Sequence, residues 1–139
     1  AQMTKSNGDA VKIAKNFTIH ACTDITGFGL AGHCLEMTRS GVGIELWLSK
    51  VPVMDGAVEC LHSLGITSSL HEANKRASGL SGLNSDAEIL FDPQTSGGLL
   101  FSVPAEESEN LVSTLIGGGY GVASIVGQVT DFSGIQVVA

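Results

Sequence analysis

The chain has 139 residues, of which 43% are hydrophobic and only 15% are charged, and its formal net charge is −7. This length suits one domain that buries its core without disulfides or metal staples, and the hydrophobic content argues against disorder. An acidic chain with no basic stripe is a poor nucleic-acid binder, and we expect no membrane span and no signal peptide. Because charged residues are so few, we expect part of the surface to be covered by another domain.

The predicted elements alternate between helices and strands along the chain. A helix over 3–16 leads to a strand over 17–23, a helix over 28–40 and a strand over 44–49. Short helices over 55–64 and 69–78 follow, then a Gly/Ser/Asn-rich loop over 78–85. A turn leads to a buried strand over 99–103, a helix over 105–116 and strands over 120–129 and 134–138. This order predicts an α+β or layered α/β fold in a single domain.

The helix over 28–40 has two predicted faces. Its apolar face holds Phe28, Ala31, Cys34, Leu35 and Thr38, and its other face holds His33, Glu36 and Arg39, with Gly41 as the predicted stop.

The three cysteines, Cys22, Cys34 and Cys60, are odd in number and form no C-x-x-C motif. Free thiols in a reducing compartment fit this pattern best, which points to the cytoplasm. The H-x-C…H-C spacing of His20, Cys22, His33 and Cys34 matches no structural zinc site. We therefore expect buried free cysteines and a surface histidine there.

Residues 27–32 read GFGLAG, a literal G-x-G-x-x-G between a predicted strand and a predicted helix. A dinucleotide loop also requires an acidic residue at the end of the next strand, whereas Glu45 lies at the beginning of its strand. Asp24 precedes the loop, where a carboxylate would repel a pyrophosphate. A nucleotide-binding oxidoreductase therefore remains only a minor alternative.

Asp24 could serve as a metal ligand if a divalent cation is present, because Mg²⁺ prefers one or two carboxylates together with waters and substrate phosphates. Thr23, Thr26 and Gly27 flank this carboxylate on a glycine-rich turn. The alternative is that Asp24 or Thr26 caps the helix that follows. The residues alone leave both interpretations open.

A second stretch, residues 92–98, reads DPQTSGG and has a related composition. The amides of Gly97 and Gly98 could cradle an anion or a carbonyl, with Thr95 and Ser96 beside them. An Asp-Pro turn with a glycine bulge explains the same residues and is the commoner arrangement. No P-loop and no nucleophile elbow occurs, so no residue of this chain is predicted to be catalytic.

Taken together, the two stretches HACTDITGFGLAGH (20–33) and LFDPQTSGGLL (90–100) resemble the C-terminal half of the selenophosphate synthetases, also called selenide, water dikinases. The similarity extends from about residue 10 to residue 130 and includes LEM at 35–37, VPV at 51–53 and IVGQV at 125–129. It implies a C-terminal domain of the aminoimidazole ribonucleotide synthetase type, with a mixed sheet and packed helices. Hydrogenase-maturation and thiamine-phosphate kinases share that fold.

The resemblance also implies an activity. The full enzyme makes selenophosphate from selenide, ATP and water, releases AMP and phosphate, and works as a homodimer. Its N-terminal domain carries the reactive Cys or selenocysteine, a lysine and most of the ATP and Mg²⁺ ligands. The C-terminal domain adds one aspartate to the metal cluster, and the matching position here is Asp24.

We therefore expect residues 1–139 to be the C-terminal domain of a longer two-domain chain, with its own N-terminal domain as partner and no activity alone. Cys22 lies in the wrong motif to be the nucleophile. Two alternatives remain: a non-catalytic regulatory or binding homologue with this fold, or the same domain of another synthetase or kinase of the superfamily.

Overall fold

The computed structural model describes residues 4–38 and 41–139. Its helices are α1 (Gly8–Ala14), α2 (Gly29–Met37), α3 (Ala57–His62), α4 (His71–Ser78) and α5 (Ala105–Gly117), with short 3₁₀ helices η3 (Leu48–Lys50) and η4 (Ser85–Phe91). Its strands are β1 (Ala21–Asp24), β2 (Gly43–Trp47), β3 (Leu99–Ser102), β4 (Gly127–Thr130) and β5 (Gly134–Val138). The predicted α+β class is confirmed.

The strands form two separate sheets. β1 and β3 make an antiparallel two-stranded ribbon, and β2 lies between β4, which is antiparallel to it, and β5, which is parallel. The second sheet is therefore mixed, as expected. Because β1 and β2, the strands on either side of α2, belong to different sheets, the glycine motif is not part of the βαβ unit that a dinucleotide loop requires.

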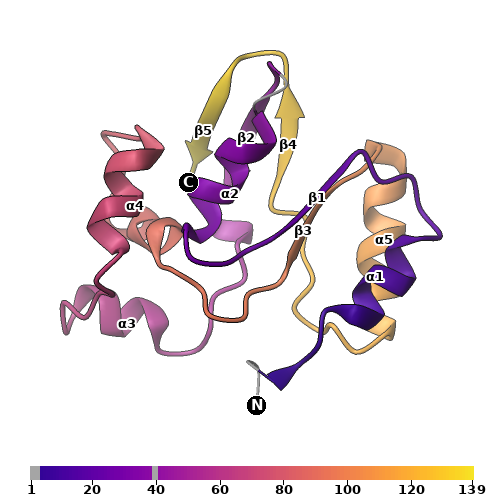
Figure 1. Ribbon diagram of the computed structural model, residues 1–139, viewed down its shortest axis with the longest axis horizontal. Coiled ribbons are helices and arrows are strands. Elements are labelled where there is room, and N and C mark those ends of the chain that lie inside the picture. The colour runs from indigo at the N-terminus through magenta and orange to yellow at the C-terminus, as the bar shows by residue number, and fades with distance from the viewer. Residues whose placement is uncertain (1–3, 39–40) are drawn as a thin grey trace.

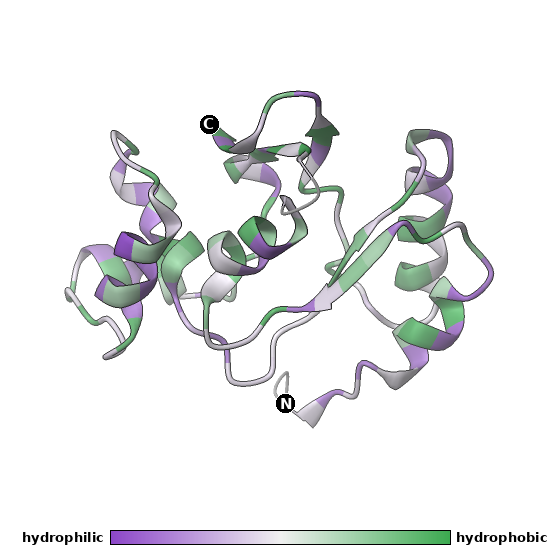
Figure 2. Ribbon diagram, turned by 45° about the horizontal axis from the view of Figure 1, so that its top comes forward, coloured by the Kyte–Doolittle hydropathy of each residue, from purple (hydrophilic) through white to green (hydrophobic). Residues whose placement is uncertain are grey.

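The ribbon of β1 and β3 runs between two groups of elements (Figure 1). On one side α1 packs against α5, and the hydrophobic residues of this pair are visible in Figure 2. On the other side α2 contacts α4 and η4, and it also packs against β5 of the mixed sheet. Asp24 is the last residue of β1, so it lies where the ribbon reaches the second group.

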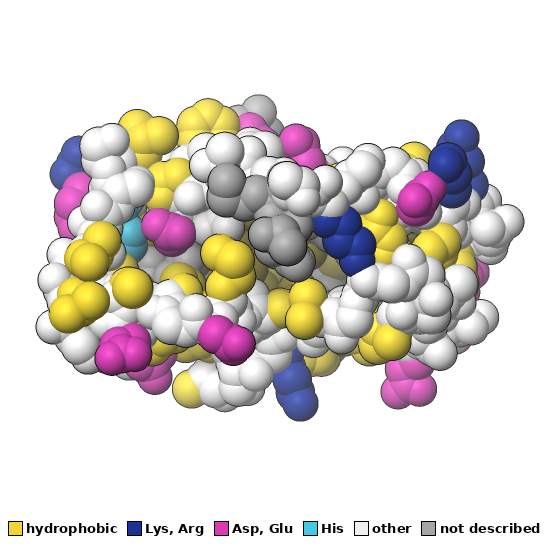
Figure 3. Space-filling model, turned by 90° about the horizontal axis from the view of Figure 1, so that it is seen from below, with side chains coloured by type: hydrophobic (Ala, Val, Ile, Leu, Met, Phe, Trp, Pro, Cys, Tyr) yellow, Lys and Arg dark blue, Asp and Glu magenta, His cyan; other side chains and the backbone are white. Residues whose placement is uncertain are grey.

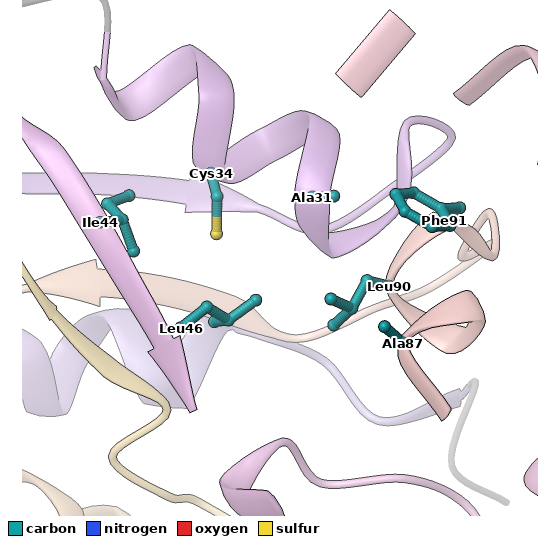
Figure 4. Close-up of a cluster of buried hydrophobic side chains, with 7 residues drawn as sticks. All are labelled: Ala31, Cys34, Ile44, Leu46, Ala87, Leu90 and Phe91. Atoms are coloured by element: carbon teal, nitrogen blue, oxygen red, sulfur yellow. The ribbon is translucent and has the colours of Figure 1, made fainter. Parts of the chain in front are cut away.

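Two hydrophobic cores correspond to these two groups. The larger core brings α2, β2 and η4 together, as Figure 4 shows, and its buried side chains are Ala31, Cys34, Ile44, Leu46, Ala87, Leu90 and Phe91. The smaller core is built on Ala10, Leu111 and Leu115. Strand β3 serves both, because Leu100 packs against the larger core while Leu99 and Phe101 pack against the smaller one. This alternation is what a strand between two apolar layers requires.

Most predicted elements are present with shorter bounds. The strand predicted over 17–23 begins later and ends one residue further on, as Ala21–Asp24, and the strand predicted over 120–129 begins at Gly127. The preceding segment is anchored by Tyr120, whose hydroxyl accepts a hydrogen bond from Ala10 N–H (2.9 Å) and donates one to Ser6 O (2.8 Å). Those contacts hold Tyr120 against α1, and the segment reaches β2 only at Val126, whose carbonyl accepts from Trp47 N–H (2.8 Å). The strand predicted as buried over 99–103 is only half-buried.

The helix η4 is absent from the predictions, which ended a loop at residue 85. Asn84 begins this helix, because its Oδ1 accepts a hydrogen bond from Ala87 N–H (3.2 Å). The first helix starts at Gly8, and Met3 lies outside the described residues. Helix α2 ends at Met37, and Arg39 and Ser40 also lie outside them.

The faces of α2 were predicted only in part. Ala31, Cys34 and Thr38 are buried as expected, but Phe28 is 58% exposed and His33 is only 5% exposed. The prediction that His33 lies on the surface is therefore wrong. Its imidazole is enclosed because it bonds to the turn that precedes the helix, a contact that helical periodicity does not reveal.

All three cysteines are free. Cys34 is buried, and burial raises the pKa of its thiol to about 12. Cys22 and Cys60 are exposed, so the prediction of buried cysteines holds for Cys34 alone. Among the described residues, no helix has both the length and the apolar character to cross a membrane.

Candidate functional site

The antiparallel pairing of β1 with β3 brings the two motifs of the sequence together. Asp24 lies opposite Leu99, and beyond this pair Ile25 N–H donates a hydrogen bond to Gly98 O (2.9 Å). Gln94 N–H then donates to Thr26 O (3.0 Å). The stretches 23–27 and 94–98 therefore form one pair of adjoining loops.

Close packing leaves no room for a side chain at Gly29 or at Gly97. A Cβ atom on Gly97 would lie 2.1 Å from Ile25 O, and one on Gly29 would lie 2.7 Å from Leu90 O. Gly29 also has a φ of +68°, which side-chain-bearing residues rarely adopt. By contrast, a Cβ on Gly27 or Gly98 would meet no atom within 4 Å. Gly29 thus lets α2 approach the chain before Asp92, and Gly97 lets the two loops touch.

The Asp24 side chain is exposed at the end of the ribbon. Within residues 4–38 and 41–139 its carboxylate has no hydrogen bond or ion pair, and the Thr23 hydroxyl reaches only the Asp24 backbone oxygen (3.4 Å). The helix-cap interpretation is wrong: α2 begins after Phe28, and the group that accepts from Gly29 N–H is the backbone carbonyl of Thr26 (3.1 Å). The Asp24 oxygens therefore remain available to a cation, as the metal interpretation requires.

The other predicted hydroxyls lie in different surroundings. Thr26 Oγ1 is 3.2 Å from His33 Nε2 and is part-buried, so it faces the protein and not solvent. Thr95 and Ser96 are exposed at the outer end of the second loop. That loop is held at Gly97 O by Asn7 Nδ2 (3.1 Å) and at Asp92 by the side-chain amide of Gln94 (2.9 Å).

Two buried residues that were not predicted from the sequence, His33 and Asn74, form hydrogen bonds to the first loop. His33 Nε2 accepts a hydrogen bond from Thr26 N–H (3.0 Å). Asn74 of α4 donates from Nδ2 to Gly27 O (2.9 Å) and to Phe91 O (3.0 Å). His33 stands within the first motif, which was the available signal, whereas nothing in the local sequence distinguishes Asn74.

The electrostatics of the ribbon disfavour Cys22 as a nucleophile. Partial burial of the Cys22 thiol raises its pKa even though the residue as a whole is exposed, and the charge of Asp24 raises it further. A raised pKa reduces the fraction of thiolate, the form that would attack.

Within the ranges that the structure describes, no three His, Cys, Asp or Glu side chains are grouped as metal ligands. Glu45, the acidic residue compared with the dinucleotide-loop pattern, accepts hydrogen bonds from Trp47 Nε1 (2.7 Å) and Gln128 Nε2 (3.0 Å).

The sequence of this chain is similar to those of known proteins of one family. The sequence model of the AIR synthase related protein C-terminal domain matches residues 1–139. A selenide, water dikinase of Pelobacter propionicus is 39% identical over 136 residues, which are 93% of this chain and 39% of that protein. A selenide, water dikinase of Agathobacter rectalis is 36% identical over 130 residues, covering 90% of this chain and 38% of that protein. The chain thus spans about two fifths of the length of these relatives.

Solved structures extend the likeness to the fold. The crystal structure of E. coli HypE, a hydrogenase maturation protein, matches with a TM-score of 0.74 at 18% identity, over 99% of this chain and 37% of that one. The expected fold is confirmed by this match, and the resemblance inferred from the two motifs is confirmed by the relatives.

Proposed function

Since the chain belongs to the family of AIR synthase related proteins, whose C-terminal domain it matches over residues 1–139, we propose that it is the C-terminal domain of a selenide, water dikinase. The parent chain would make selenophosphate from selenide, ATP and water, with AMP and phosphate as the other products. The support is identity of 36–40% to proteins of that name over most of this chain. ATP binding would belong chiefly to an N-terminal domain of the parent.

The observation that carries the proposal is the exposed Asp24 carboxylate at the junction of the two loops. Its oxygens have no partner in the part of the chain that the structure describes, and the turn behind it is anchored at Ile25 N–H and Thr26 O. An unpaired carboxylate on an anchored turn fits one coordination position of Mg²⁺. The remaining protein ligands would come from the N-terminal domain.

In this proposal the residues of this chain bind and position the metal and phosphates and do not themselves react. Bound Mg²⁺ clamps phosphate oxygens and offsets negative charge during phosphoryl transfer. Asp24 contributes by being ionised and correctly placed, and the loop of Thr95 and Ser96 would border the phosphates. Thr23, Gly27, Gly97 and Gly98 would shape the backbone around them.

The surface supports a covering partner. The accessible surface is 8089 Å², whereas a compact monomer of 14.3 kDa exposes about 6,800 Å². Six of the exposed large hydrophobic side chains fall between residues 53 and 70: Val53, Met54, Val58, Leu64, Ile66 and Leu70. Figure 3 shows hydrophobic side chains across the lower face, including a group at the end that carries α3. We propose that the parent's N-terminal domain covers part of this surface, and that the parent is a cytoplasmic homodimer.

The test of the proposed function is Asp24→Asn in the full-length parent, assayed for selenide-dependent AMP formation. Loss of one metal ligand should lower turnover by about 100-fold or more, with an unchanged far-UV spectrum and melting temperature. Asp131→Asn is the matched control, because Asp131 is also an exposed aspartate at the end of a strand. Near-normal turnover in Asp24→Asn would rule out the ligand role.

Calorimetry separates a shared site from a local one. We expect Mg²⁺-dependent ATP binding by the full-length parent and none by residues 1–139, which should also lack activity. Tight binding to residues 1–139 alone would place the nucleotide site within this domain and contradict the proposed division of labour.

A further inference from the structure

The turn between Asp24 and α2 is held by side chains that come from outside it. Phe28, the residue before the helix, makes no side-chain cap. The backbone groups of the turn find partners elsewhere: Thr26 N–H bonds to His33 and Gly27 O to Asn74. Both partners are nearly buried, with exposures of 5% for His33 and 8% for Asn74. Buried polar side chains that bond to one short turn limit how that turn can move.

The geometry defines the protonation of His33. A backbone N–H can only donate, so His33 Nε2, which lies 3.0 Å from Thr26 N, carries a lone pair and no hydrogen. The neutral ring then has its hydrogen on Nδ1, which faces the Glu36 carboxylate at 3.3 Å. The Phe28 ring lies 5.6 Å from the imidazole and tilted by 42°, and so covers it. Only this tautomer leaves Nε2 able to accept from Thr26 N–H, and it turns the Nδ1 hydrogen toward Glu36, although Nδ1 makes no hydrogen bond within the described residues.

Asn74 connects the first loop to the end of η4 through one amide group. Its Nδ2 has two hydrogens, and they bond to Gly27 O, three residues after Asp24, and to Phe91 O, next to Asp92. The two carbonyls are 64 positions apart in the sequence. A side chain with two acceptor oxygens at position 74 would instead repel both carbonyls.

We propose that His33 and Asn74 are positioning residues that set the Asp24 turn for metal–phosphate binding, His33 acting as the neutral imidazole with its hydrogen on Nδ1. This inference rests on the proposed function. Neither side chain touches the metal or the nucleotide. Residues that orient a metal ligand in this way commonly change metal affinity by about 10- to 100-fold when replaced.

The test measures, by calorimetry on the full-length parent, the Mg²⁺ concentration that half-saturates ATP binding, with turnover measured alongside. Asn74→Asp keeps the shape of the side chain but removes the donor, and should raise that concentration at least tenfold. Ser78→Ala is the matched control: Ser78 lies one turn later in α4, is also 8% exposed, and bonds to Lys75 O of its own helix (2.7 Å). A purely structural role would lower the active fraction in both variants and leave their Mg²⁺ requirement unchanged.

A second pair keeps the test decisive if Asn74→Asp does not fold. His33→Gln retains an oxygen that can accept from Thr26 N–H, and should keep the Mg²⁺ requirement within a few-fold of wild type. His33→Leu should raise it at least tenfold. Equal Mg²⁺ requirements for Gln and Leu, or an unchanged requirement in Asn74→Asp, would overturn the positioning role. Because Asp24→Asn tests the proposed function by itself, failure of the positioning role can be told apart from failure of the proposed function.

Discussion

Replacing Gly97 with alanine tests whether the two loops must touch. The new Cβ would lie 2.1 Å from Ile25 O and 3.1 Å from Ile25 C. Both are backbone atoms, so no side-chain rotation can relieve the clash. The loops must separate by more than 1 Å to reach the 3.4 Å of ordinary contact.

The cost follows from the bonds that such a separation breaks. The hydrogen bonds Ile25 N–H to Gly98 O (2.9 Å) and Gln94 N–H to Thr26 O (3.0 Å) both join the two loops. Each is worth about 0.5–1.5 kcal/mol net, and overpacking adds about 1–3 kcal/mol. Because the loops relax in part, we expect Gly97→Ala to lower the free energy of unfolding by about 2–4 kcal/mol in total. An unfolding entropy of about 2.1 cal/mol/K per residue, applied to this chain of 139 residues, converts that loss into a melting temperature lower by about 7–14 °C.

The assay is urea and thermal unfolding followed by circular dichroism and by the fluorescence of Trp47, the one tryptophan in the sequence. Gly98→Ala is the control, because a Cβ on Gly98 meets nothing within 4 Å and its φ is not left-handed. That variant should be neutral or slightly stabilising, by up to about 1 kcal/mol. If Gly97→Ala and Gly98→Ala unfold within about 0.5 kcal/mol of each other, the reasoning from loop contact is refuted.

Three further outcomes are expected. Gly29→Ala should destabilise the chain by about 2–4 kcal/mol in urea unfolding, through its +68° φ and the 2.7 Å approach to Leu90 O, whereas equal effects of Gly29→Ala and Gly27→Ala would contradict a specific need for glycine. Asp24→Asn should lower the pKa of Cys22 by removing a nearby charge. The rate at which Cys22 reacts with iodoacetamide at fixed pH should then rise by about fivefold at most, measured by mass spectrometry relative to the rate of the exposed Cys60 of α3. An unchanged ratio of these two rates would refute the coupling. Burial acts to raise the pKa of Glu88, but hydrogen bonds from two basic side chains outweigh it and hold that pKa below 4.5. The stability that Glu88 supplies is present above its unfolded-state pKa and is lost as pH falls through the folded-state value. Glu88→Gln should therefore destabilise at pH 7 and have little effect at a pH acidic enough to protonate Glu88 in both the folded and the unfolded state, and an equal loss at both pH values would contradict this.

Local pattern was sufficient for much of the fold. The helix predicted over 105–116 is Ala105–Gly117, and the strand predicted over 134–138 is Gly134–Val138. Apolar periodicity reports which face of an element is buried, and it works wherever that face meets a core. The motif around Asp24, read together with residues 92–98, was also enough to indicate the family that the comparisons confirm.

Contacts between segments that are far apart in the sequence could not be predicted from the sequence alone. Nothing local indicates that Asp24 lies opposite Leu99, or that Asn74 bonds to Gly27 and Phe91. His33 was assigned to the surface because helical spacing places it on the same face as Glu36 and Arg39, yet it is buried by its bond to Thr26. The sequence by itself determined the family, most elements and the metal-binding candidate. Only the tertiary structure decided which side chains hold that candidate in place, because a buried donor or acceptor is satisfied by whichever group the folded chain brings near it, however far away in sequence.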